Sequence, residues 1–250
     1  MLNILTDSCA DLSQHLIDAH RLHVIPLHVL VSGKDHHDNE LSLNQLFSSV
    51  DETGELPKTA APSVKEFIDF FNLEGPLIYI GLSSELSATM ANAQLAANQL
   101  ENPNLHLVDS HNLSTGIGLV ALKAADLRDQ GKSAEEVVST IETLRSKVKT
   151  AFVIDTMDYL HKGGRCTGLQ AFVGSMLQIR PVIHVRQDGT LGVLDKVRGS
   201  RRKALDRLLQ GFAADLPMID LTRVFVTHTG CDADAAYLVE ELQKLAKIEA

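Results

Sequence analysis

Short apolar runs alternate with amphipathic segments along the first 150 residues. The mainly apolar runs lie at residues 2–5, 77–80 and 105–108, and each is followed by a polar turn. The run at residues 77–80 is apolar throughout, which is typical of a strand buried on both faces of a parallel sheet. The segments between them have helical periodicity. This alternation predicts a parallel α/β domain over residues 1–150, with right-handed connections.

Serine residues mark several of the predicted helix starts. Ser63 precedes an amphipathic segment at residues 64–71, and Glu66 follows three residues later, which is the pattern of a capping box. The first predicted helix begins at about Asp11.

Residues 23–31 are interpreted as one strand, in which Pro26 indicates an edge position or a bulge.

The pattern changes after Lys149. Asp188-Gly189 lies between two apolar runs and predicts a hairpin. Further elements are predicted as helices at residues 155–160, 169–178 and 234–247 and as a strand at residues 224–230. The sequence therefore predicts a second, mixed α/β domain over residues 151–250.

A cluster of hydroxyl groups follows the apolar run at residues 77–80. Ser83, Ser84 and Ser87 lie where that strand gives way to a helix rich in small residues. The first N–H groups of a helix lack intrahelical partners, and the helix dipole favours negative charge there. This turn is therefore a candidate anion site. The alternative is that Ser84 or Ser87 simply caps its own helix.

Composition excludes several classes of function. The 250 residues carry a formal charge of −9, which argues against nucleic-acid binding, and 4% aromatic residues with no Trp offer little surface for stacking. Three distant cysteines show no metal-finger spacing and are expected to be reduced. No apolar run is long enough for stable membrane insertion and no signal segment is visible, so we expect a cytoplasmic protein.

Three other candidate sites have simpler interpretations. Residues 35–40 combine carboxylates and imidazoles, but ligands adjacent in sequence without a distant partner are typical of a solvated turn, so we expect no metal. Gly116 and Gly118 lack the third glycine of a dinucleotide fingerprint, and close helix packing is the favoured use. A hydrolase using Ser84 or Cys9 would be an alternative enzyme, but no GxSxG motif supports it.

Several separated motifs together resemble those of the DegV family. Residues 6–12 resemble the family motif TDSxxDL, and residues 83–89 resemble SSxLSGT with Ala88 in place of Gly. The remaining motifs lie at residues 59–63, where Ala60 replaces Ser, and at residues 108–118, 155–165, 174–181 and 196–204. Members of this family are two-domain α/β proteins that bind a long-chain fatty acid, and some are the lipid-carrying subunit of a bacterial fatty acid kinase.

The resemblance implies a lipid carrier that has no cofactor and is not itself an enzyme. It assigns the fatty acid carboxylate to Thr59 and to Ser83, Ser84 or Ser87. The acyl chain is expected in an apolar tunnel between the lobes, lined in part by residues 169–179. The carrier would present the lipid to the kinase for acyl phosphate formation, which feeds phospholipid synthesis.

Two arginines and the end of the chain complete what the resemblance implies. Arg165 and Arg198 match family arginines associated with kinase docking and phosphate transfer; a solvated basic turn is the alternative. Basic residues at 198–203 form a candidate landing surface for an acidic partner or a phosphate. Family members continue to a further strand and an HxGPG-type segment, whereas this sequence ends at Ala250, so we expect a missing or shortened terminus.

Overall fold

The computed structural model describes residues 1–165, 169 and 179–248. The chain folds into two compact units. The first contains Met1–Thr150 and Val185–Thr190, and the second contains Ala151–His184 and Leu191–Ala250. The fold class is mixed α/β, as predicted, and each unit is described below by itself.

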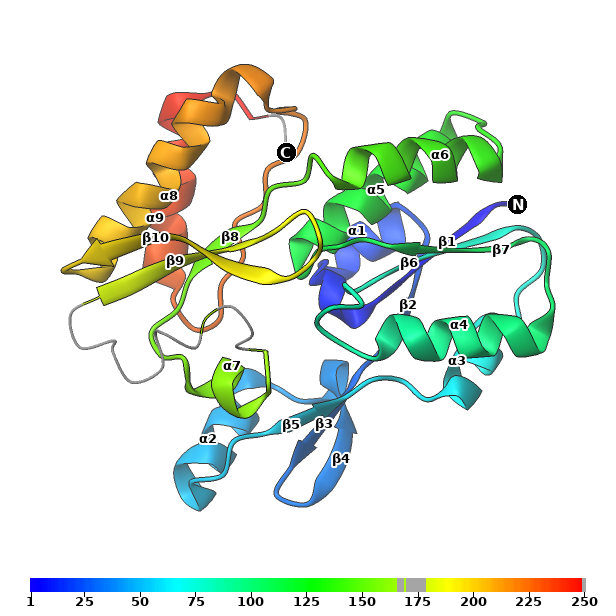
Figure 1. Ribbon diagram of the computed structural model, residues 1–250, viewed down its shortest axis with the longest axis horizontal. Coiled ribbons are helices and arrows are strands. Elements are labelled where there is room, and N and C mark those ends of the chain that lie inside the picture. The colour runs from blue at the N-terminus through cyan, green and yellow to red at the C-terminus, as the bar shows by residue number, and fades with distance from the viewer. Residues whose placement is uncertain (166–168, 170–178, 249–250) are drawn as a thin grey trace. The chain divides into compact units, whose positions relative to one another are not determined.

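The first unit is built on a four-stranded sheet with the strand order β2-β1-β6-β7 (Figure 1). All of its ladders are parallel, and Ile4 of β1 lies opposite Ile78 of β6. Every residue of β6 is buried, which confirms the expectation for an apolar run in the middle of a parallel sheet. The strands are β1 (Asn3–Asp7), β2 (Leu22–Ile25), β6 (Leu77–Gly81) and β7 (Leu105–Asp109).

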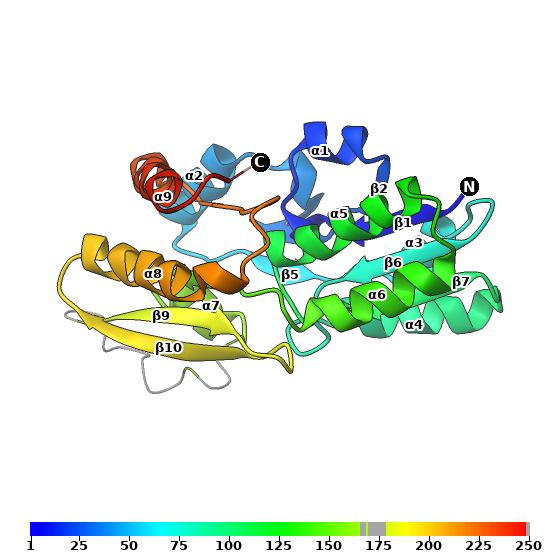
Figure 2. The same ribbon diagram turned by 90° about the horizontal axis from the view of Figure 1, so that it is seen from above.

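Helices cover both faces of this sheet. Figure 1 shows α3 and α4 on one face and α5 and α6 on the other, and Figure 2 shows α5 and α6 over the strands. Phe67 lies on α3 and Phe71 directly follows it. Both pack with Tyr79 of β6 in one core cluster. The helices of the unit are α1 (Gln14–Ala19), α2 (Leu43–Thr53), α3 (Val64–Phe70), α4 (Thr89–Leu100), α5 (Thr115–Asp129) and α6 (Ala134–Arg145).

Local signals placed most of these helix starts correctly. Ser63 and Glu66 form the predicted capping box of α3. The first helix starts later than expected, because Asp11 adopts a left-handed conformation with φ of 50° and ends the 3-10 turn η1 (Ser8–Ala10). α1 then begins at Gln14, with the Ser13 hydroxyl as its cap.

A second, antiparallel sheet lies in the same unit. Its strand order is β4-β3-β5, formed by β4 (Lys34–His37), β3 (His28–Val31) and β5 (Lys58–Ala60). The single strand predicted for residues 23–31 is therefore wrong. Pro26 has no N–H to donate to a ladder, and it lies between β2 in one sheet and β3 in the other.

Glycines of α5 serve close packing, as the sequence favoured. A Cβ at Gly116 would lie 2.1 Å from Asn112 Oδ1 and 2.5 Å from Thr150 Oγ1. A Cβ at Gly118 would lie 2.7 Å from Leu12 Cδ2. The space that a side chain would need is filled by the protein itself.

The second unit contains a sheet of order β10-β9-β8 and three α-helices in its described part. β9 and β10 run in opposite directions and are joined by the turn at Arg186–Thr190, where the hairpin was predicted (Figure 1). The elements are β8 (Ala151–Val153), α7 (Asp158–Lys162), β9 (Ile179–Val185), β10 (Leu191–Arg198), α8 (Arg201–Asp215), η4 (Leu216–Met218) and α9 (Asp232–Leu245).

One strand predicted for this unit is absent, and one predicted helix lies mostly outside the described residues. The strand predicted at residues 224–230 is wrong, because this segment joins no ladder with the described strands, and β-type residues form a strand only with a partner. The helix predicted at residues 169–178 lies outside the described residues except for Leu169, which is buried. None of the described helices combines the length and apolar character that a membrane span requires.

Candidate functional site

The buried carboxylate of Asp7 on β1 binds the backbone just after β6, where the serine turn begins. Asp7 lies at the end of β1 and is completely buried. Its Oδ2 accepts hydrogen bonds from the Tyr79 hydroxyl at 2.9 Å and from the Leu82 N–H at 2.8 Å, and its Oδ1 accepts one from the Cys9 N–H at 3.1 Å. Because Leu82 precedes Ser83, Asp7 positions the turn from the neighbouring strand.

The ionisation of Asp7 reflects two opposing effects. Burial raises the pKa of this carboxyl to about 6, although the hydrogen bonds from Leu82, Tyr79 and Cys9 favour the charged form and lower it. The native state therefore binds a proton more tightly than an unfolded chain, in which an Asp pKa is about 3.9. The stability that this proton contributes is present at low pH and is lost as pH rises through 6.

We expect this titration to appear in the pH dependence of stability. Relative to Asp7→Asn, which does not titrate, the wild-type protein should gain about 1.4 kcal/mol of unfolding free energy when pH falls from 7 to 5. Urea unfolding of both proteins at the two pH values measures this gain. An equal difference at both pH values would show that Asp7 does not titrate in this range.

The three serines of the turn have different environments. Ser83 is buried; its hydroxyl donates to the Gly189 carbonyl at 3.0 Å and accepts the Glu85 N–H at 3.3 Å. The Ser87 hydroxyl lies 2.8 Å from Thr89 Oγ1 and accepts the Thr89 N–H at 3.3 Å. Ser84 is exposed, and among the described residues only its backbone has a hydrogen bond, to Asp109 at 3.2 Å. Ser84 therefore carries the available hydroxyl.

Helix α4 begins directly after this turn and has no side-chain cap from the described residues. Its N-cap position is occupied by Ala88, whose methyl group cannot accept a hydrogen bond. Neither Ser84 nor Ser87 occupies the N-cap position, although Ser87 satisfies the first helical N–H. The N–H groups that follow Thr89 at the start of α4 lack a capping oxygen in this part of the chain, which is the condition that favours an anion there.

Thr59 lies on strand β5. It pairs with Val29 of β3 and is exposed. The segment that follows β5 is attached to the first turn of α4, because Asn92 donates its side-chain N–H to the Pro62 carbonyl at 2.8 Å. This contact connects the Thr59 segment to the helix that the serine turn opens.

Comparison with known proteins identifies the family. A family model described as "Uncharacterised protein, DegV family" matches residues 1–250. The chain belongs to the DegV family. A DegV domain-containing protein of Clostridium acetobutylicum is 36% identical over 208 residues, which are 81% of this chain and 74% of that relative.

Solved DegV structures share the fold. A DegV family protein from Thermus thermophilus, described by its fatty acid binding, aligns with a TM-score of 0.78 and 31% identity over 85% of this chain and 77% of that chain. The Fatty Acid Kinase (Fak) B3 protein of Streptococcus pneumoniae, loaded with linoleic acid, aligns with a TM-score of 0.84 and 27% identity over 98% of this chain and 88% of that chain.

The two arginines singled out by the DegV motifs lie in the second unit. Arg198 is the last residue of β10 and is exposed. Arg165 follows the double glycine after α7, and its guanidinium donates to the Gly163 carbonyl.

The neighbouring basic residues are only partly available to a partner. Arg201 forms ion pairs with Asp155 and Asp234, and the Arg202 guanidinium lies 2.9 Å from the centroid of the Tyr237 ring. These two arginines are engaged by their own unit, so the landing surface expected from residues 198–203 is smaller than the sequence suggested.

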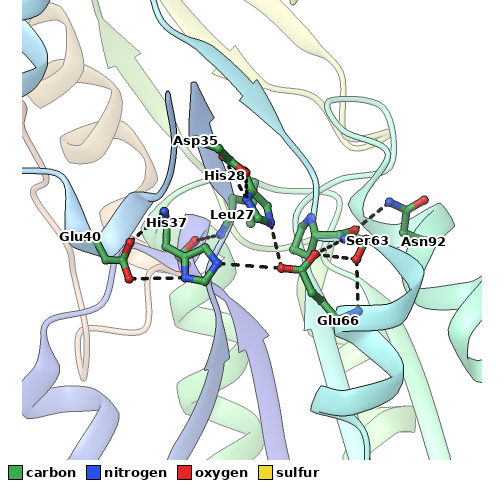
Figure 3. A network of polar contacts seen from close by, with 10 residues as sticks. Leu27, His28, Asp35, His37, Glu40, Ser63, Glu66 and Asn92 are labelled. Carbon is green, nitrogen blue, oxygen red and sulfur yellow. Dashed lines mark hydrogen bonds and ion pairs between the residues drawn. The ribbon is translucent and has the colours of Figure 1, made fainter. Parts of the chain in front are cut away.

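The fold also brings together side chains that are far apart in the sequence. His37, from the segment at residues 35–40, faces His28 of β3 and Glu66 of α3 (Figure 3). The expectation that this segment has no distant partner is therefore wrong. No periodic pattern links positions so far apart in sequence; only the pairing of β3 with β4 and the packing of α3 brings them together.

Proposed function

We propose that this chain binds a long-chain fatty acid, and that the hydroxyl groups of Thr59 and Ser84 hold its carboxylate. The observation that carries the proposal is the exposed Ser84 hydroxyl, which has no partner among the described residues and belongs to the turn that joins β6 to α4. The fatty acid binding of the Thermus thermophilus relative supports the same ligand class.

Neutral donors suit this ligand. A carboxylate can accept hydrogen bonds from hydroxyl groups and from helix N–H groups, and such charge-assisted bonds are about twice as strong as neutral ones. No buried cation is needed, and a permanent unpaired charge would be costly to bury when the site is empty. Ser83 and Ser87 use their hydroxyls within the protein, so we assign them to shaping the turn.

We further propose that the protein presents its lipid to a kinase as a carrier. The linoleic acid bound to the Streptococcus pneumoniae fatty acid kinase B3 protein supports this role, in which Arg165 and Arg198 would face the kinase. The hydrolase alternative is not favoured, because the Ser84 hydroxyl makes no hydrogen bond to a histidine or a carboxylate among the described residues, and Asp109 accepts only the Ser84 backbone N–H. A serine nucleophile needs such a base.

Binding of oleate to the delipidated protein tests the carboxylate site. Thr59→Ala and Ser84→Ala should each weaken binding about tenfold, since a hydrogen bond to a charged group contributes about 1.5 kcal/mol. Ser87→Ala is the comparison variant on the same turn, and it should weaken oleate binding less than Ser84→Ala, because the Ser87 hydroxyl bonds Thr89 and is not assigned to the carboxylate. Native mass spectrometry gives the stoichiometry, and titration gives the affinity.

Two results would contradict the proposal. The first is a wild-type protein that takes up no oleate. The second is a Ser87→Ala effect as large as that of Ser84→Ala, which would move the carboxylate away from Ser84. Acyl phosphate formation by an added fatty acid kinase, with Arg165→Ala and Arg198→Ala compared to the wild-type protein at saturating oleate, tests the carrier role separately.

A further inference from the structure

Two imidazoles and one carboxylate converge in the first unit, outside the serine turn. His28 and His37 lie opposite each other on the paired strands β3 and β4, and Glu66 reaches them from the first turn of α3 (Figure 3). The Glu66 Oε1 atom lies 2.9 Å from His28 Nε2 and 3.9 Å from His37 Nε2. One ligand atom from each of the three residues lies within 4.8 Å of the other two.

The geometry points to a site for a divalent transition metal, and we propose that it binds Zn²⁺ through His28 Nε2, His37 Nε2 and Glu66 Oε1. Zinc–ligand bonds of about 2.0–2.2 Å in a tetrahedron separate neighbouring ligand atoms by about 3.3 Å. The observed separations bracket this value, so small side-chain rotations complete the geometry. Two histidines and one carboxylate, with the fourth position open, are a typical zinc donor set.

The outer atoms of two of the proposed ligands, His28 and Glu66, are held by hydrogen bonds, and Glu40 lies near the outer nitrogen of His37 without a hydrogen bond to it. The other ring nitrogen of His28, Nδ1, lies 3.0 Å from Asp35 Oδ2, and that of His37 lies 3.8 Å from Glu40 Oε1. A carboxylate at Nδ1 fixes the tautomer that leaves Nε2 free to bind metal, and metal-binding histidines commonly have such a partner. The Ser63 N–H and hydroxyl both donate to Glu66 Oε2, at 2.8 and 2.6 Å, which leaves Oε1 for the ion.

Charge and access support a cation. Three carboxylates, from Asp35, Glu40 and Glu66, surround two imidazoles, and a divalent ion would balance most of this negative charge. The side chains of His37 and Glu66 are 39% and 37% exposed, so an ion can enter from solvent. Adjacency in sequence does not explain the cluster, because Glu66 is far from both histidines along the chain.

A proton on His28 is the competing explanation. Burial lowers the pKa of this histidine, but hydrogen bonds and charge from Glu66 and Asp35 outweigh that effect and raise it overall. An imidazolium between two carboxylates would be a stable ion pair that needs no metal. Zinc binding distinguishes the two states, because metal coordination needs the neutral ring.

The test is calorimetric titration of the chelator-treated protein with ZnCl₂ at pH 7.5. The wild-type protein should bind one ion per chain. His37→Ala and Glu66→Gln should weaken zinc binding about tenfold or more, and Asp35→Asn, which keeps all three ligands, should also weaken it about tenfold. Gln at position 66 can preserve the capping box, so this variant separates ligand loss from loss of the helix cap.

His36→Ala is the matched control. His36 is on the same strand as His37, and successive side chains of a strand point to opposite faces. This variant should bind zinc with wild-type affinity. The Co²⁺ form of the wild-type protein should show the intense visible bands of a tetrahedral site without thiolate charge transfer.

Three outcomes would overturn the assignment. They are no zinc uptake by the wild-type protein in molar excess of ZnCl₂, equal affinity of the wild-type and His37→Ala proteins, and loss of binding when cysteines are alkylated. The proposed zinc ligands are different side chains from those proposed for the fatty acid carboxylate, so oleate affinity and zinc affinity should be lost in different variants.

Discussion

Asp7→Ala is expected to lower the free energy of unfolding by about 3 kcal/mol at pH 7. The substitution leaves three donors without their acceptor: the Tyr79 hydroxyl and the Leu82 N–H, which are buried, and the Cys9 N–H, which is partly buried. Each buried unpaired donor costs about 1–3 kcal/mol. Removal of a carboxyl that is costly to ionise when buried offsets part of this sum, since the pKa of Asp7 is raised to about 6.

Urea unfolding of the variant measures this loss, with Asp69→Ala as the control. Asp69 is exposed on α3 and pairs with Lys65 at 3.0 Å, an i,i+4 contact that contributes about 0.3–0.5 kcal/mol. Equal effects of the two substitutions would mean that the Asp7 hydrogen bonds contribute nothing beyond a surface ion pair. Because Asp7 positions the serine turn, the variant should also bind oleate more weakly under conditions where it remains folded.

Asp7 illustrates what the sequence could and could not predict at the site. The motif at residues 6–12 and the turn at residues 81–89 were both recognised as polar strand ends. Their connection was not, because β1 and β6 become neighbours only when the sheet forms. Ser83, Ser84 and Ser87 were equivalent in the sequence; the positions of Gly189 and Thr89 in the structure distinguish their hydroxyls.

Local signals were sufficient for most of the fold. Apolar runs between polar turns gave β6 and β7, and Ser63 with Glu66 gave the start of α3. Pro26 was interpreted as an edge position or a bulge within one strand, whereas it separates two strands of different sheets. Residues 224–230 have strand composition without a partner strand among the described residues, and composition alone cannot supply the partner.

The proposed metal site also shows that sequence adjacency does not identify residues that meet only in the fold. The sequence drew attention to residues 35–40 because carboxylates and imidazoles are adjacent there, yet only His37 of that segment is a proposed ligand. Asp35 and Glu40 contribute through the second nitrogens of the two histidines. His28 and Glu66 come from a neighbouring strand and a helix, so the donor set is visible only in three dimensions.

Phe67→Ala is expected to lower the free energy of unfolding by about 3–5 kcal/mol, because it creates a cavity in the core between α3 and the parallel sheet. The Phe67 side chain is completely buried, and its ring centroid lies 5.4 Å from those of both Phe71 and Tyr79. Urea unfolding measures the loss, and Phe47→Ala on α2 is the control, since that ring is 38% exposed and should cost much less.

A similar cost for the two phenylalanines would show that α3 is not held by this cluster. The distinction matters for the proposed zinc site, because Glu66 is the neighbour of Phe67 on α3 while His28 and His37 belong to a separate sheet. If the aromatic cluster fixes α3, it also fixes the distance from Glu66 to the two imidazoles. Under conditions where Phe67→Ala remains folded, its zinc affinity should therefore fall, whereas that of Phe47→Ala should not change.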